Sequence, residues 1–147
     1  GGKMEDEGGL KRRVEDVLAT MKKEGVLKSR GLRKLVISCH SGGGRPAGFC
    51  LDRGGMNTYI TDVFLFDALY EQEDSFRAWL TQAKGSLWGV YTEHLANEHS
   101  QFELSLGDDA KKLLHFTRTN VEHDEVIQAF FSSWLSQLGS RWKLEGK

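Results

Sequence analysis

The sequence predicts an α+β fold with one antiparallel sheet of about five strands and helices packed on it. Three observations indicate this class. Short β-branched and aromatic runs follow one another closely, glycine-rich turns join them, and stretches with helical apolar spacing lie at both ends of the chain. Connections this short cannot carry the chain over to a parallel neighbour, so antiparallel pairing is expected. The predicted element order is α-β-β-β-α-β-β-α.

The first half of the chain is expected to form a helix and a three-stranded meander. Apolar residues recur at helical spacing between Leu10 and Met21, and Gly25 follows as the natural C-terminal stop. Strands are then expected over residues 35–39, 48–52 and 58–66, with the glycine-rich segment 41–46 as the first turn.

The second half is expected to form a central helix, a hairpin and a last helix. The central helix starts at Asp67 or Asp74, is interrupted at Gly85 and continues to residue 95. The hairpin strands cover 102–106 and 112–117, around the turn at 107–109. The last helix covers 122–138, and we expect it to bury Ile127, Phe131 and Trp134.

Length and charge narrow the class of protein. The 147 residues are expected to form a single α+β domain over 10–147, after a disordered or tag-derived stretch over 1–9. With 20 basic and 21 acidic residues the charge balance gives no electrostatic case for nucleic-acid binding. The chain also lacks an apolar run of membrane-spanning length and a signal peptide, so a cytoplasmic location without membrane contact is expected.

One local pattern could belong to a catalytic site, namely Cys39-x5-Arg45 directly after an apolar strand. The pattern resembles the phosphate loop of cysteine-dependent phosphatases, where a thiolate attacks phosphorus and an arginine holds the oxygens. That loop runs into a helix, whereas here a β-like run is expected to follow, so a glycine-rich hairpin loop is the preferred interpretation. The five histidines lack zinc-site spacing. We therefore expect no catalytic residue, no metal and no cofactor.

A resemblance to a known family comes from the last third of the chain. The two hairpin strands, their turn, the acidic residues 122–125 and a helix ending near Arg141 and Trp142 are similar to bacterial type III secretion chaperones. The resemblance implies a non-enzymatic protein that binds an extended effector segment and forms a homodimer. The same topology could serve an immunity protein that neutralises a toxin.

Five apolar residues are the candidates for binding a protein partner. The end of the run 58–66 is apolar on both sides, which a strand covered on one face does not require. A second aromatic cluster lies beside the break at Gly85, and we expect it to form the homodimer contact. The predicted partner-binding residues are Phe64, Phe66, Leu87, Trp88 and Tyr91.

Overall fold

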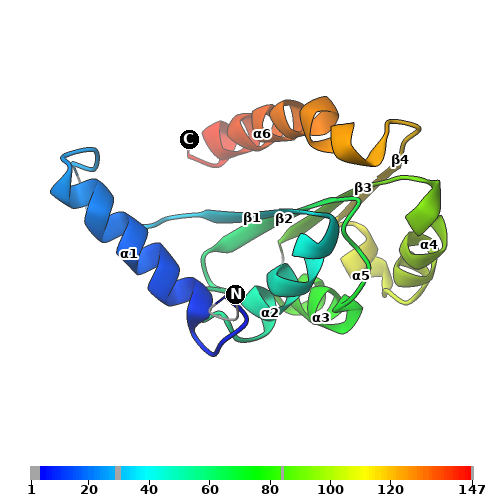
Figure 1. Ribbon diagram of the computed structural model, residues 1–147, viewed down its shortest axis with the longest axis horizontal. Coiled ribbons are helices and arrows are strands. Elements are labelled where there is room, and N and C mark those ends of the chain that lie inside the picture. The colour runs from blue at the N-terminus through cyan, green and yellow to red at the C-terminus, as the bar shows by residue number, and fades with distance from the viewer. Residues whose placement is uncertain (1–3, 29–30, 84, 147) are drawn as a thin grey trace.

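Four parallel strands form the sheet of this protein, in the order β1-β2-β3-β4. The computed structural model describes residues 4–28, 31–83 and 85–146 (Figure 1). The strands are β1 (Leu35–His40), β2 (Ile60–Phe66), β3 (Ser86–Tyr91) and β4 (Leu114–Arg118). Each strand therefore begins at one edge of the sheet and ends at the opposite edge.

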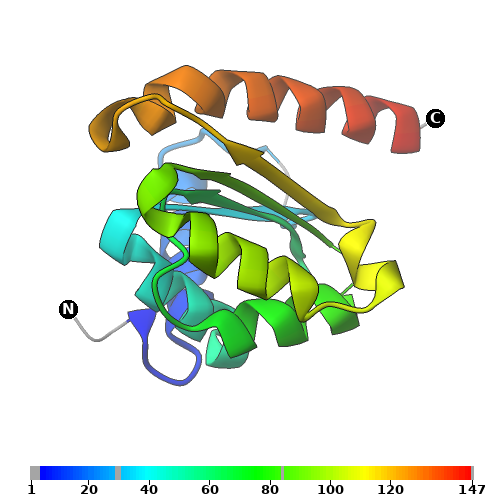
Figure 2. The same ribbon diagram turned by 90° about the vertical axis from the view of Figure 1, so that its right-hand side faces the viewer.

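Helices connect the strands and cover both faces of the sheet. They are α1 (Gly9–Lys23), α2 (Gly44–Arg53), α3 (Glu73–Ala83), α4 (Ala96–Leu104), α5 (Asp108–Lys111) and α6 (Val126–Glu145). Short 3₁₀ turns precede three of them: η2 (Ser41–Gly43), η3 (Glu93–Leu95) and η4 (His123–Glu125). Figure 2 shows α6 on one face of the sheet and α2, α3 and α4 on the other.

The side chains of β2 alternate between the two faces. Val63 and Leu65 belong to the cluster under α2 and α3, whereas Phe64 and Phe66 belong to the cluster under α6. A central strand of a parallel sheet is covered on both sides, which explains why this run is apolar throughout.

Helix α2 lies unusually close to the segment that follows β2. A Cβ atom on Gly44 would lie 1.9 Å from the carbonyl oxygen of Ala68, and one on Gly48 would lie 2.3 Å from Cβ of Gln72. The two glycines are four residues apart and share one face of the helix. Their missing side chains allow this approach, which holds the start of α2 beside the end of β2.

The predicted antiparallel sheet of about five strands is wrong. Residues 48–52 belong to α2 and residues 102–104 belong to α4, so two of the expected strands are helices. The segment 86–91, expected as the continuation of a helix, is β3. These exchanges place a helical crossover between successive strands, and such crossovers make the neighbouring strands parallel.

The last helix, α6, packs on the sheet through a narrower stripe of apolar side chains than the sequence indicated. The stripe recurs every fourth residue and consists of Val126, Phe130, Trp134, Leu138 and Trp142. Trp134 is buried as expected, Phe131 is half-buried, and Ile127 is 38% exposed. The expected burial of Ile127 is therefore wrong, because Val126 takes the position that faces the sheet.

Residues 4–9 of the expected disordered start are placed against α2. The backbone N–H of Gly8 donates to the carbonyl oxygen of Arg53 at 2.8 Å, and Gly9 begins α1. The remaining part of that expectation, residues 1–3, lies outside the described residues. Among the described residues, no helix combines the length and apolar character needed to cross a membrane.

Candidate active site

A row of polar residues lies at the edge of the sheet where all four strands end. The last paired residues of β1 and β2 are His40 and Phe66, so Ser41 and Asp67 follow as neighbours at this edge. Thr92 follows β3 in the same way. In an open parallel sheet, the carboxyl ends of the strands are the usual place for a ligand or a reacting group.

Ser41 and Asp67 both have a strained backbone. Their φ angles are 52° and 46°, in the left-handed region that side-chain-bearing residues seldom adopt. Ser41 forms the sharp turn between β1 and the helical segment of η2 and α2. Strain of this kind persists where the surrounding structure imposes it, and it concentrates at functional sites.

Asp67 is the best-buried charged group at this edge, with 1% of its surface exposed. Its Oδ1 accepts a hydrogen bond from the backbone N–H of Thr92 at 2.9 Å. Its Oδ2 accepts one from the Thr92 hydroxyl at 2.9 Å and one from Nδ1 of His123 at 2.7 Å. Burial alone raises the pKa of Asp67, but the hydrogen bonds from His123 and Thr92 outweigh it and leave the pKa below its ordinary value. The carboxylate is therefore ionised near neutral pH.

The hydrogen bond to Asp67 determines which nitrogen of His123 is available. Because Nδ1 donates to the carboxylate, the neutral ring carries its lone pair on Nε2. The side chain of His123 is 36% exposed, and this lone pair points away from the buried carboxylate. His123 thus has the orientation of a general base whose partner is a buried carboxylate.

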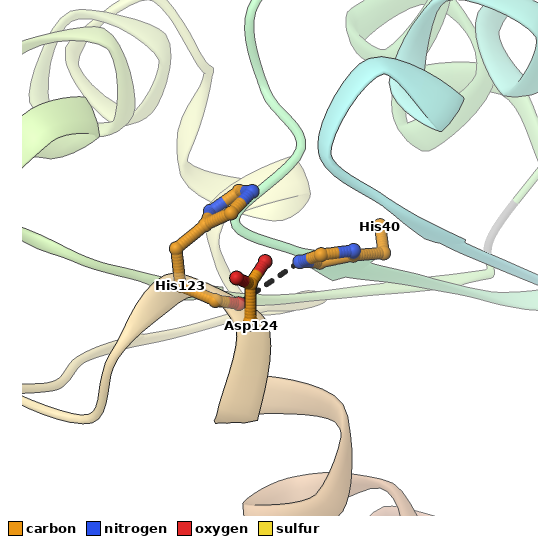
Figure 3. Close-up of side chains that lie close together, drawn as sticks. All are labelled: His40, His123 and Asp124. Carbon is orange, nitrogen blue, oxygen red and sulfur yellow. Dashed lines mark hydrogen bonds between the residues drawn. The ribbon is translucent and has the colours of Figure 1, made fainter.

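His40 anchors the segment that carries His123. Its Nε2 donates to the backbone carbonyl of His123 at 2.9 Å, and the two ring centroids are 4.5 Å apart. Figure 3 shows Asp124 beside them, with its carboxylate directed towards the space between the two imidazoles. Since Ser41 follows His40 directly, this contact holds His123 at the strand end that carries Ser41. Among the described residues, no hydrogen bond joins Ser41 to His123, so that contact belongs to the proposal below.

His123 and Thr92 line a shallow hollow between the ends of β3 and β4. Its volume is about 290 Å³, and it is lined by Thr92, Glu93, Thr119, Asn120, Val121, Glu122 and His123. A hollow of about 650 Å³ lies at the opposite edge of the sheet, beside Ile60 and Ser86. The smaller hollow is the better candidate because it is lined by His123 and Thr92, the two hydrogen-bond partners of the Asp67 carboxylate, whereas none of the described histidines lines the larger one. Ser41 and Asp67 are not among the residues that line the smaller hollow.

The five predicted partner-binding residues lie mainly in the core. Phe64, Phe66 and Leu87 have no exposed surface, and Trp88 is 9% exposed. The indole N–H of Trp88 donates to Asp62, and half-buried Tyr91 stacks on His99 at 4.1 Å. The structure thus does not bring the five together on one open surface. Phe64 and Phe66 pack against α6 of the same chain, where the sequence alone indicates either the central helix or a partner.

Cys39 and Arg45 do not converge on a common site. The thiol of Cys39 lies 3.7 Å from the carbonyl oxygen of Phe64, while exposed Arg45 pairs with Glu5 and Glu71. Burial, with a smaller contribution from Cys50, raises the pKa of the Cys39 thiol to about 12. A thiol with that pKa is protonated at neutral pH and is a poor nucleophile. The helix that the phosphatase interpretation needs is present, but the residue at the turn into it is Ser41.

Sequence reasoning missed Ser41, Asp67 and His123. A local signal for Ser41 was present, since Cys39-His40-Ser41-Gly42-Gly43 resembles Gly-x-Ser-x-Gly with cysteine in the first place. Pro46 in the first turn of α2 also favours a helix there. His123 and Asp67 are 56 residues apart, and no local pattern connects them.

No protein-family model, curated protein or solved structure matches this chain. The resemblance to secretion chaperones is therefore neither supported nor refuted by a relative. The element order on which that resemblance depended differs from the parallel order of the structure.

Proposed function

We propose that this protein is a serine hydrolase in which Ser41 is the nucleophile, His123 the general base and Asp67 the orienting carboxylate. The observation that carries the proposal is the 2.7 Å hydrogen bond from His123 to buried Asp67, at the strand edge where Ser41 forms a strained turn. A serine on a sharp strand-to-helix turn is the nucleophile elbow of α/β-hydrolases, and their triad also follows the chain order serine, acid, histidine. Such triads are recognised by geometry and roles.

The reaction that suits this arrangement is acyl transfer from an ester or a related acyl compound to water. The oxygen of Ser41 attacks the carbonyl carbon while its proton passes to Nε2 of His123. The bond to the leaving alcohol then breaks, and the alcohol takes that proton from His123. A water molecule then gives a proton to Nε2 of His123 and attacks the acyl carbon. The bond to the Ser41 oxygen breaks, Ser41 takes the proton back from His123, and the acid is released.

The residues around Ser41 fit the charge that develops during this reaction. The backbone N–H of the residue after the nucleophile, here Gly42, is the expected donor to the oxyanion. Gly42 and Gly43 lie at the amino end of the η2–α2 segment, where free backbone N–H groups favour negative charge. The ionised carboxylate of Asp67 stabilises the imidazolium that forms on His123.

The expectation of a non-enzymatic binding protein has less support. It depended on the absence of a nucleophile and base in the sequence, and on the exposure of residues that are buried in the structure. The cytoplasmic location, the homodimer and the protein partner remain predictions. None of the observations at the carboxyl edge favours them over the hydrolase.

Ester turnover with a series of variants tests the proposal. The substrates are p-nitrophenyl esters of short and medium acyl chains, and the readout is the initial rate of p-nitrophenol release. We expect Ser41→Ala and His123→Gln to lower kcat/KM by roughly 10²–10⁴-fold, and Asp67→Asn to lower it in the same direction by disturbing the His123 tautomer.

Ser38→Ala is the matched control, because Ser38 is an exposed serine on β1, three residues before Ser41. It should keep the wild-type rate. Thermal unfolding of every variant separates a lost site from a lost fold. Equal rates for folded Ser41→Ala and wild-type protein would refute the proposal.

A further inference from the structure

A second chemistry is available at this edge of the sheet, because three potential metal ligands lie together there. One ligand atom each from His40, His123 and Asp124 can be chosen so that all three atoms lie within 4.8 Å of one another. They come from the end of β1 and from η4, two segments more than 80 residues apart in the chain that the fold brings together (Figure 3).

We propose that His40, His123 and Asp124 bind a zinc ion that inhibits the hydrolase. The site follows from the geometry alone, whereas its inhibitory effect rests on the proposed function. Two imidazoles and one carboxylate form a ligand set that zinc accepts, with a water molecule in the fourth position. Imidazole nitrogen favours zinc over magnesium and calcium, which prefer an all-oxygen site.

The hydrogen bond to Asp67 prepares His123 for a metal as well as for a proton. A ligating histidine usually donates its second ring N–H to a carboxylate, which fixes the tautomer and strengthens the ligand. His123 has this partner already, in Oδ2 of Asp67 at 2.7 Å. Its Nε2 lone pair is therefore directed away from Asp67, on a ring that this hydrogen bond holds in place.

The other two ligands have the freedom to close around an ion. Ligand atoms around tetrahedral zinc lie about 3.3 Å apart, since each bond is about 2.0–2.1 Å long, so the cluster must contract. Asp124 is exposed on a short 3₁₀ turn and can swing inwards by a side-chain rotation. His40 would exchange its hydrogen bond with the carbonyl of His123 for a bond to the ion.

Metal binding and catalysis exclude each other in this arrangement. Both use the same lone pair on Nε2 of His123, as a zinc ligand or as the acceptor of the Ser41 proton. A bound ion would also cover the space in front of His123. Zinc is therefore expected to act as a reversible inhibitor, because it competes with the Ser41 proton for Nε2 of His123.

Two measurements on the chelator-treated full chain test the proposal. Isothermal titration with zinc chloride measures binding, and the p-nitrophenyl ester rate measures inhibition at the same zinc concentrations. We expect one zinc ion per chain, and an ester rate at least about tenfold lower at saturation. His40→Gln and Asp124→Asn should each weaken binding by roughly 10–100-fold.

The controls use a histidine and an acid outside the cluster. His94→Gln and Glu125→Gln remove exposed residues near the same edge of the sheet and should bind zinc like the wild type. Ser41→Ala should also bind zinc unchanged, although it should have no ester activity above background. That variant separates the two proposals, because its zinc binding does not depend on turnover.

The possible outcomes separate the metal site from the hydrolase activity. Ester turnover without stoichiometric zinc binding would overturn the inference and leave the hydrolase in place. Zinc binding that His40→Gln and Asp124→Asn both weaken, in a protein without ester turnover, would keep the metal site but refute the hydrolase and with it the inhibition. Zinc binding that neither variant weakens, or a rate that rises with zinc, would contradict the proposed site.

Discussion

Replacing Gly44 with alanine tests how the close approach of α2 positions the site. The new Cβ would lie 1.9 Å from the carbonyl oxygen of Ala68, about 1.5 Å short of ordinary van der Waals contact. The obstacle is backbone and cannot rotate away, so α2 and the segment after β2 must separate. Overpacking of this kind costs roughly 1–3 kcal/mol, and we expect about 3 kcal/mol here. For a chain of this length that corresponds to a melting temperature lower by about 6–12 °C.

Gly42→Ala is the matched control for this loss. Gly42 is two residues away in the same segment, has no heavy atom within 4 Å of its Cβ position, and has an ordinary φ angle. Alanine there should leave the free energy of unfolding unchanged or raise it by about 0.4–1 kcal/mol. Urea unfolding of both variants, followed by tryptophan fluorescence, gives the comparison. Equal stabilities for Gly44→Ala and Gly42→Ala would refute the account of the tight packing between α2 and Ala68.

Three further predictions follow from buried side chains. Trp134→Ala removes the ring that stacks on Phe66 at 4.8 Å and should cost about 3–5 kcal/mol in urea unfolding, whereas Leu135→Ala, 43% exposed, should cost far less. Burial lowers the pKa of His99 from 6.5 to about 4, so below pH 6.5 the unfolded chain binds a proton that the folded protein excludes. The contribution of His99 to the free energy of unfolding should be complete above pH 6.5 and fall by up to about 3 kcal/mol as the pH drops towards 4. A folded His99→Gln variant with the same pH dependence would contradict this assignment. Cys39 should resist iodoacetamide at pH 8 in the folded protein, because burial raises its pKa to about 12, and should react in urea; mass spectrometry of the folded sample would detect an alkylated Cys39 if the reasoning is wrong.

Part of the fold could be predicted from the sequence. Four predicted elements correspond closely to observed ones: the first helix with α1, the runs 35–39 and 58–66 with β1 and β2, and the run 112–117 with β4. These segments have strong local patterns, either helical apolar spacing or β-branched and aromatic runs. Local chemistry was sufficient for them because their packing agrees with their intrinsic preference.

The parallel arrangement was missed because two segments have ambiguous patterns. Residues 48–52 are a short apolar run that fits a strand or a helix equally well, and only Pro46 indicated the start of α2. In residues 102–106 apolar and polar side chains alternate, which is typical of a strand. The structure instead places this segment at the end of α4 and just after it, where Phe102 and Leu106 are buried and Leu104 is 70% exposed. The apolar run on both sides of β2 was itself a signal of a parallel central strand.

The candidate site could be predicted only in part. The turn at Ser41 has a recognisable local pattern, but its meaning depends on the helix that follows it. The sequence alone places Asp67 at a possible start of the central helix and His123 in an acidic stretch before the last helix. Their relationship exists only after the ends of β2 and β4 come to the same edge of the sheet, so it is a property of the topology.

The central claim is that the fold activates Ser41 through His123 and Asp67. Covalent labelling with a fluorophosphonate probe, followed by peptide mass spectrometry, tests it most directly because the probe reacts with activated serines. The account predicts one adduct per chain on the peptide that contains Ser41, with much slower labelling of His123→Gln and none of Ser41→Ala at that peptide. No adduct on Ser41 in the folded wild-type protein, or labelling of Ser41 at the same rate in His123→Gln, would contradict it.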